Sequence, residues 1–202
     1  MLPRKNRLPP WGTLRLATER DAAGVAALYA PYVQDTAISF EYTPPDEAAM
    51  RRRIASTLET YPFLVWDEPD GIKGYAYASR FGVRAAYDWV AELSIYLRPE
   101  LRGTGVAEAL YRALMRLLRE QGVWRVYAII TDATPASRRF HEKLGFQVYG
   151  QFPASGYKLG SWHDVLHMEL ALREGSGAPA PLLAIGDLPQ GLIEQLLANR
   201  QQ

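Results

Sequence analysis

The sequence predicts an α+β fold in which a mixed central sheet is flanked by helices. Strand and helix signals follow one another in the order β-α-α-β-β-β-α-β-α-β-β. The run of consecutive strands in the middle argues against a doubly wound fold, in which helices and strands alternate. The 202 residues suit one domain with a tail. We expect a leader at 1–12, a domain at 13–173, and a linker with a C-terminal tail at 174–202.

Composition excludes several kinds of site. The chain has no cysteine, which rules out disulfides and thiol nucleophiles. Its net charge of +1 gives no reason to expect nucleic acid or a membrane as a partner. No apolar run approaches the roughly 20 residues that span a bilayer, and the basic leader lacks the apolar core of a secretory signal. His163 and His167 form no ligand cluster with carboxylates, so we expect no metal. The expected protein is soluble and cytoplasmic.

In the first half of the chain, turn and capping signals separate the elements. Leu14 and Leu16 alternate with a polar residue in a short strand, and Thr18-Glu-Arg-Asp21 is a capping box for the first helix. The second helix opens at Thr43-Pro-Pro-Asp46. Three strands then follow, at Phe63–Trp66, Ile72–Ser79 and Ala91–Leu97. The turn Glu68-Pro-Asp-Gly71 joins the first two, and a loop at 80–88 precedes the third.

The second half begins with a strongly amphipathic helix that ends at Gln121-Gly122. A strand is expected next, then a helix that starts near Thr134, then two strands separated by a long loop. A short amphipathic helix closes the tail after a Gly/Pro-rich linker. In order, these elements are Trp124–Thr131, Pro135–Leu144, Phe146–Phe152, Val165–Leu172 and Pro189–Asn199.

A glycine turn joins the central strand to the amphipathic helix. Gly103 and Gly105 flank Thr104, so the backbone can turn sharply with few side chains in the way. The unpaired amides and the dipole of the following helix would favour a phosphate. The pattern lacks the Lys-Ser/Thr of a nucleoside-triphosphate loop. By itself it fits a plain tight turn equally well.

A second helix–strand unit, Ser137–Phe146, follows the glycine turn about thirty residues later and favours a binding role for the turn. With this context the chain resembles the GNAT-superfamily N-acetyltransferases. Arg102, Gly105 and Ala107 match the family's (Q/R)-x-x-G-x-(G/A) signature. Within that family the chain is most similar to the phosphinothricin and methionine sulfoximine branch, over residues 13–172. The matching stretches are Thr36–Pro45, Gly74–Leu97, Arg138–Phe146 and Gly156–Asp164.

The resemblance implies the GNAT fold, acetyl-CoA as cosubstrate and a homodimer. It places the diphosphate of CoA on the amides of Arg102, Gly103, Thr104, Gly105, Val106, Ala107 and Glu108. It pairs the pantetheine arm with the backbone of Ile95, Tyr96 and Leu97, whose side chains pack in the core at the same time. Thr134 and Lys143 are further implied contacts, although the branch usually has Asn where this chain has Thr134. The branch's Thr-Val before the catalytic glutamate is also replaced here, by Val90-Ala91.

Glu92 is the candidate general base. Strand alternation puts it on one face with Ser94 and Tyr96, and a carboxylate in a central strand needs a reason because burying an unpaired charge is costly. Acetylation needs a neutral amine, so a base must accept a proton directly or through water. The resemblance gives Glu92 that role. The alternative is a structural ion pair with Arg80 or Arg84.

His141 and Tyr96 are the other catalytic candidates. The branch has a histidine at the position of His141, which could orient Glu92 or relay a proton; a packed helix residue is the alternative. Tyr96 is one possible acid for the leaving thiolate, as is water. A backbone N–H near Ile95–Tyr96 would meet the oxyanion.

The substrate candidates are Arg80, Arg84 and Tyr87, because a guanidinium suits a carboxylate or phosphinate. Solvated loop arginines are the alternative. Phe40 and Tyr42 are candidates for the pocket wall. Trp162 and Asp164 fall in a stretch that the branch uses for substrate or dimer contacts, and a core tryptophan and a turn residue are their alternatives.

These observations predict an acetyl-CoA-dependent N-acetyltransferase that acts on the α-amino group of a small amino acid or analogue. A non-catalytic acyl-CoA-binding module is one alternative. An acetyltransferase for peptide N-termini or polyamines is another, although a polyamine site should be rich in acidic residues.

Overall fold

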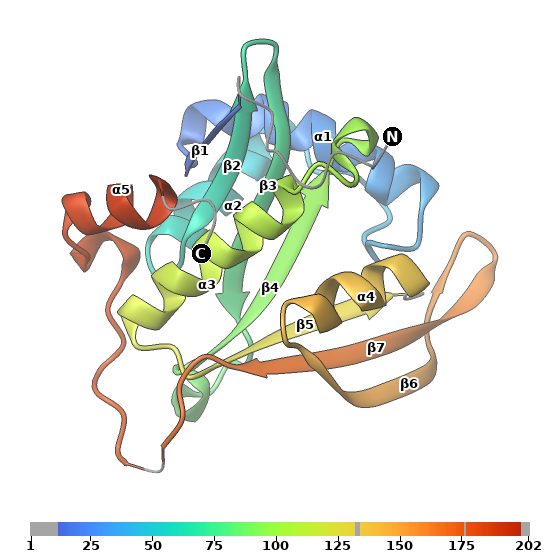
Figure 1. Cartoon of the computed structure of the whole chain (residues 1–202). Helices are drawn as coiled ribbons and strands as arrows, with labels where there is room; N and C mark the ends of the chain where they lie inside the picture. Colours follow the sequence, from blue (N-terminus) through green and yellow to red (C-terminus); the bar gives the residue numbers. More distant parts are fainter. Residues whose placement is uncertain (1–11, 132–133, 176, 199–202) are drawn as a thin grey trace, which may run out of the picture.

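A seven-stranded mixed sheet forms the centre of the molecule (Figure 1). The computed structural model describes residues 12–131, 134–175 and 177–198. The helices are α1 (Ala22–Asp35), α2 (Glu47–Leu58), α3 (Val106–Gln121), α4 (Pro135–Lys143) and α5 (Gln190–Ala198). The strands are β1 (Thr13–Leu16), β2 (Phe63–Glu68), β3 (Gly71–Arg80), β4 (Val90–Leu97), β5 (Arg125–Thr131), β6 (Gln147–Lys158) and β7 (Ser161–Ala171). The predicted α+β class and element order are confirmed.

The strand order is β1-β2-β3-β4-β5-β7-β6. Every neighbouring pair is antiparallel except β4 and β5, which run parallel. Helices α1 and α2 cover one face of the sheet, which we call the back face. Helices α3 and α4 lie on the other, the front face (Figure 1). The sheet thus separates two apolar cores.

Side-chain alternation in β3 decides which helices each face receives. Gly74, Ala76 and Ala78 face α3, and this small-residue row lets the apolar stripe of α3 pack closely. Tyr75 and Tyr77 face the opposite way, toward α1 and α2. The large aromatic side chains therefore lie on the back face and the closely packed helix lies on the front face.

The pairing between β4 and β5 ends early. Register pairs join them only from Val90 to Glu92, whereas β3 pairs with β4 from Ala91 to Leu97. Beyond Glu92 the two strands diverge. Half of β4 is therefore a central strand, and the other half has a free edge on one side.

The prediction of a long loop between residues 152 and 165 is wrong. β6 and β7 continue as a hairpin to a tight turn in which Leu159 and Gly160 both have positive φ, of 50° and 80°. A two-residue hairpin turn of type I′ requires positive φ at both positions. Gly150, Pro153 and Gly156 indicate a loop in the sequence, but the structure accommodates them through register shifts in the strand.

The C-terminal segment packs against the domain as a strap, which we define as residues 177–198. Its apolar side chains join the front-face core through Ile185 and Ile193, and α5 lies against α3 and β1. The Gln121 amide donates to the carbonyls of Thr60 and Leu183, 2.6 and 2.8 Å away. The expected tail helix is present as α5; residues 1–11 and 199–202 lie outside the described part of the chain.

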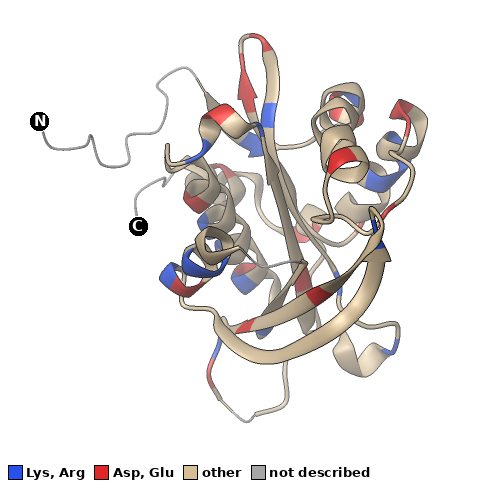
Figure 2. Cartoon of the chain, turned by 90° about the vertical axis from the view of Figure 1, so that its right-hand side faces the viewer, with Lys and Arg blue, Asp and Glu red and all other residues tan. Residues whose placement is uncertain are grey.

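Charged residues of both signs are distributed over the helices and strand ends (Figure 2). Within the described residues, no helix is long and apolar enough to cross a membrane. The same residues contain no group of three or more His, Asp or Glu side chains placed to hold a metal ion.

Candidate active site

The glycine turn opens α3 with outward-facing amides. Gly103 and Gly105 have φ of 76° and 92°, and Gly105 is the N-cap of α3. The Arg102 amide donates to Pro99 O, and the Thr104 amide to Leu101 O. The amides of Gly103, Gly105, Ala107 and Glu108 have no acceptor among the described residues. Successive free N–H groups with alternating backbone hand form an anion-binding concavity at the positive end of a helix.

The free edge of β4 presents backbone groups to the gap between the strands. The Arg98 N–H donates to Lys73 O of β3 at 2.7 Å, and the Trp89 carbonyl accepts from Trp124 N on the opposite side. Because backbone direction alternates along a strand, Leu93, Ile95 and Leu97 turn their amides away from β3. Past Glu92 no β5 residue pairs with them. This edge can accept an extended chain as an additional strand.

A cavity fills the gap between the diverging strands. We call it the β4–β5 cleft. It has a volume of about 130 Å³ and is bordered by β4, β5, α3 and the start of α4. Among the predicted site residues it is lined by Ile95, Tyr96, Thr134 and His141; its other lining residues include Leu93, Ser94, Tyr111, Ser137 and Ala128–Thr131.

Glu92 lies where β4 and β5 separate. Its register partners are Ser79 on β3 and Tyr127 on β5. Its carboxylate makes no hydrogen bond or ion pair with any described residue, so the alternative of a structural ion pair with Arg80 or Arg84 is not observed. Burial raises the pKa of Glu92 above its ordinary value of 4.5. A desolvated carboxylate without a cationic partner is a stronger proton acceptor than an ion-paired one.

His141 is buried and held in one orientation. Its Nδ1 lies 2.9 Å from the Ser137 carbonyl, which can only accept, so Nδ1 carries the proton. Burial lowers the pKa of His141 and favours the neutral ring. Nε2 then has a free lone pair, and the Tyr111 hydroxyl lies 3.4 Å from it. The same hydroxyl is 3.5 Å from Leu93 O.

Tyr96 is enclosed by aromatic rings. The ring centroids of Tyr29, Tyr32 and Tyr75 lie 4.8, 5.1 and 5.2 Å from its own. Burial raises the pKa of Tyr96 well above 10. Tyr96 is one of the residues that line the cleft, and its ring packs against the back-face core.

Thr134 and Lys143 lie at the two ends of α4. Thr134 is the N-cap, and its hydroxyl accepts the Ser137 amide at 3.2 Å, as its sequence position predicted. The Lys143 ammonium donates to Glu108 in the first turn of α3. This ion pair places a cation beside the glycine turn, and Glu108 partly neutralises it.

The predicted substrate arginine Arg80 lies on the front-face side of β3, in register with Ala91. Its guanidinium donates to Asp88 at 2.6 Å. Arg84 and Tyr87 are exposed in the loop between β3 and β4, and the Tyr87 ring packs edge-on against Phe81. The structure therefore does not bring Arg80 onto the face that carries Glu92.

The aromatic candidates Phe40, Tyr42 and Trp162 lie at the β6–β7 hairpin. The Phe40 ring rests on Gly156, where an added Cβ would lie 2.2 Å from a ring atom. The Tyr42 hydroxyl donates to Tyr157 O. Trp162 is 65% exposed, so the alternative of a core tryptophan is wrong. These contacts tie the segment after α1 to the hairpin.

Asp164 has a structural position on the hairpin. It accepts a hydrogen bond from the Ala154 amide at 2.9 Å, where β6 carries an irregularity. This contact stabilises a residue with positive φ, since Ala154 has φ of 48°.

Comparisons with known proteins fit this geometry. Residues 14–167 match the model of the acetyltransferase (GNAT) domain. A phosphinothricin N-acetyltransferase from Alcaligenes faecalis is 35% identical over 166 residues, which are 81% of this chain and 84% of that protein. An L-methionine sulfoximine/L-methionine sulfone acetyltransferase from Pseudomonas aeruginosa is 32% identical over 169 residues, 83% of this chain and 98% of that protein.

A solved structure agrees with both. The phosphinothricin acetyltransferase from Sinorhizobium meliloti, crystallised with acetyl-CoA, has a TM-score of 0.80 and 37% identity, covering 84% of this chain and 94% of its own. The chain therefore belongs to the GNAT acetyltransferase family and is an N-acetyltransferase. Within the family it groups with the phosphinothricin and methionine sulfoximine N-acetyltransferases, as its motifs predicted.

Sequence reasoning missed two groups of residues. Tyr111 lies beside the apolar stripe of α3, so its pattern did not distinguish it from core. Tyr77 and Arg53 face a back-face pocket, but one is a strand aromatic and the other one of three consecutive arginines. Only the packing of α2 on the sheet brings them together.

Proposed function

We propose that this enzyme transfers the acetyl group of acetyl-CoA to the α-amino group of a small amino acid or analogue, of the phosphinothricin or methionine sulfoximine kind. Direct attack of the amine on the thioester is the proposed route. The observation that carries the proposal is the position of Glu92, an unpaired and desolvated carboxylate at the point where β4 opens its edge.

The residues present fit acetyl-CoA. The four free amides of the glycine turn suit its diphosphate, with Lys143 close by. The amides of Ile95 and Leu97 and the Ile95 carbonyl suit the amide-bearing pantetheine arm, whereas the Leu97 carbonyl already accepts from the Tyr32 hydroxyl. Acetyl-CoA supplies the activated acyl group, and this chain's backbone holds it along the free edge of β4.

Glu92 accepts the proton of the attacking amine. At neutral pH the α-amino group of a free amino acid is mostly protonated, so a base beside it raises the reactive fraction. The Ile95 amide is the donor best oriented toward the developing oxyanion, because alternation turns the Tyr96 amide toward β3. This refines the expected Ile95–Tyr96 position to one residue.

A tyrosine hydroxyl protonates the leaving thiolate. Tyr96 and Tyr111 both line the cleft. Burial raises the pKa of both hydroxyls. Tyr111 is better supported, because its hydroxyl lies within reach of His141 Nε2 while the Tyr96 ring is surrounded by three tyrosines on the back face. His141 acts through Tyr111 as a positioning residue in this scheme.

The assembly we propose is a homodimer. The β6–β7 hairpin exposes a set of large side chains that a second copy would cover: Val148, Tyr149, Phe152, Tyr157 and Trp162. Light scattering after size exclusion tests this directly, and a monomeric mass would contradict it.

A thiol-release assay tests the catalytic proposal. Acetyl-CoA is offered with phosphinothricin, methionine sulfoximine, common amino acids, a polyamine and a peptide. Turnover with free amino acids or their analogues, and with neither the polyamine nor the peptide, is expected. Tight CoA binding with no turnover on any amine would favour the binding module instead.

A further inference from the structure

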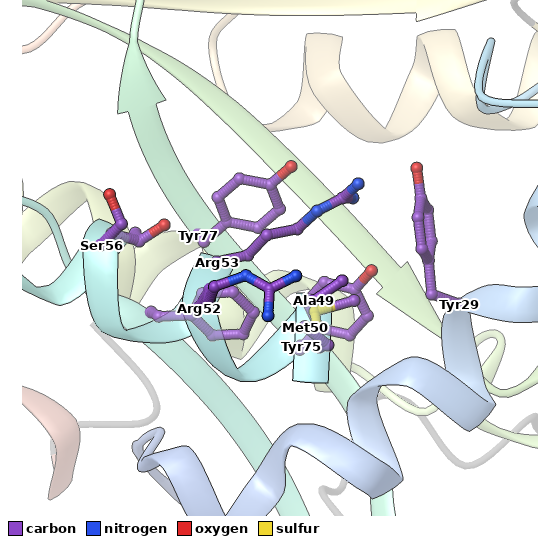
Figure 3. A pocket seen from close by; sticks show the side chains of 10 residues that line it. Tyr29, Ala49, Met50, Arg52, Arg53, Ser56, Tyr75 and Tyr77 are labelled. Carbon is purple, nitrogen blue, oxygen red and sulfur yellow. The ribbon is translucent and has the colours of Figure 1, made fainter. Parts of the chain in front are cut away.

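A second cavity lies on the back face between α2 and the sheet (Figure 3). We call it the α2 pocket. It has a volume of about 460 Å³. Its floor is formed by Phe63, Tyr75 and Tyr77, whose rings stack with centroids 5.1–5.4 Å apart along Phe63. The remaining lining residues are Tyr29, Ala49, Met50, Arg52, Arg53, Ser56 and Thr57.

The α2 pocket lies on the same face as Glu92. Tyr77 is in register with Ser94 of β4, and Ser79, the next residue on that face of β3, is in register with Glu92. Two residues along a strand correspond to about 7 Å. An amino acid whose amine is held at Glu92 can therefore extend its side chain across Tyr77 toward α2.

The rim of the pocket is cationic. Arg53 donates two hydrogen bonds to the Glu41 carboxylate, of 2.7 and 2.8 Å. The Tyr29 hydroxyl adds a third at 2.9 Å. The hydrogen bonds from Arg53 hold the pKa of Glu41 below its usual range, so Glu41 stays ionised and neutralises one arginine.

Arg52 is the remaining charge. It lines the pocket and forms no ion pair with any residue that the structure describes. Arg80, by contrast, is paired with Asp88 and belongs to the other face. Arg52 is therefore an unneutralised cation of the pocket, on the face of the sheet that carries Glu92.

We propose that the α2 pocket is the subsite for the acceptor's side chain and selects an amino acid with an apolar stem of several carbons and a terminal anion. The aromatic floor contacts the stem, and Arg52 binds the anion beside the Arg53–Glu41 pair. This inference rests on the proposed function, because it takes Glu92 as the position of the amine.

Two amino acids of equal length test the subsite. L-2-aminoadipate ends in a carboxylate where L-norleucine ends in a methyl group. The wild-type enzyme should show kcat/KM at least about 10-fold higher for L-2-aminoadipate, the discrimination expected of a charge-assisted hydrogen bond. In Arg52→Gln, the KM for L-2-aminoadipate should rise about 10-fold with little change in kcat, and norleucine should be unaffected.

Two further variants complete the design. Arg51→Gln is the matched control, because Arg51 is the preceding residue of α2 but pairs with Glu47 away from the pocket. It should leave both substrates unchanged. Ala49→Phe fills the pocket; it should impair both long substrates and spare L-alanine, whose side chain ends before Tyr77.

The outcomes separate the subsite from the reaction. A wild-type preference for norleucine, or equal losses for both substrates in Arg52→Gln, would overturn the subsite and leave the acetyltransferase standing. If no amine releases thiol, the proposed function fails. In that case, calorimetric titration of L-2-aminoadipate into the CoA complex tests the subsite separately from catalysis. The subsite proposal is overturned if the wild type binds no L-2-aminoadipate or if Arg52→Gln binds it equally well.

Discussion

The two halves of β4 behave differently although they form one strand. At Ala91 and Glu92 the strand is paired on both sides, by β3 and β5. From Ser94 to Leu97 it is paired by β3 alone and borders the β4–β5 cleft. The closed half fixes a carboxylate in a desolvated position, and the open half offers free backbone groups to a ligand.

The change occurs within one residue of Glu92. A rigid position for the base and an open edge for the thioester therefore adjoin, without any flexible loop between them. Reacting groups held by regular structure keep the geometry that a bimolecular reaction needs. If this division is right, substitutions in the two halves should affect different kinetic constants.

The largest effect is expected from the closed half. Glu92→Gln keeps the shape but removes the proton acceptor, so kcat should fall by about 1,000-fold, within the range typical of general bases. The dissociation constant for CoA, measured by calorimetry, should stay within about twofold, because no amide of the open half changes.

Glu169→Gln is the matched control for Glu92→Gln. Glu169 is also in register with Tyr127, but it is ion-paired to Arg125 at 3.1 Å. Its kcat should remain near that of the wild type. Equal activity of Glu92→Gln and the wild type would remove Glu92 from the mechanism.

The next effect concerns the acid. Tyr111→Phe removes the hydroxyl beside His141 and should lower kcat by about 100-fold, at the low end for acid catalysis. Tyr96→Phe should change kcat by less than about threefold, since its ring packs among the back-face tyrosines. The reverse ranking, measured with the same amine, would assign the proton to Tyr96.

The glycine turn offers a matched pair. Gly103 and Gly160 have φ of 76° and 80°, and an added Cβ meets nothing within 4 Å at either position. Alanine at either should cost about 1–2 kcal/mol in the free energy of unfolding, because L residues disfavour this backbone. Gly103→Ala should also raise the KM for acetyl-CoA about 10-fold through lost phosphate contact; Gly160→Ala should not. Equal KM values would show that the turn is structural.

Much of the fold was predictable because its signals are local. The capping residues Asp46 and Thr134 and the glycine that ends α3 each mark a helix boundary in a few letters of sequence. The β6–β7 hairpin was missed because Leu159 takes a positive φ that no local signal announces. Its turn is imposed by cross-strand pairing on either side.

The site was predictable only in part, for a related reason. Glu92 and the glycine turn are adjacent in sequence, so alternation and motif were enough to find them. The contact of Tyr111 with His141 spans 30 residues, and the α2 pocket needs a helix to pack on a distant strand. Such contacts depend on the tertiary structure, and local periodicity does not determine them.

The smallest effect concerns stability and again involves Glu92. Burial raises its pKa in the folded state, so between the unfolded value near 4.5 and the raised folded value the native protein binds more protons than the unfolded chain. Stability contributed by this group is therefore lost as pH rises through that window. Glu92→Gln lacks this loss, so it should melt at the same temperature as wild type at pH 4 and at a higher one at pH 7.5.

The pH dependence of the wild-type kcat/KM should report the ionisation of the same carboxyl group, with the opposite trend to stability. Activity needs the ionised carboxylate, so it should fall as pH drops through a pKa above 4.5. The pH range in which ionisation of Glu92 raises kcat/KM is then the range in which it lowers the stability of the fold. A melting temperature of Glu92→Gln below that of the wild type at pH 7.5 would mean that the carboxylate stabilises the fold. In that case the closed half of β4 would be an ordinary structural strand, and the contrast with its open half would lose its catalytic meaning.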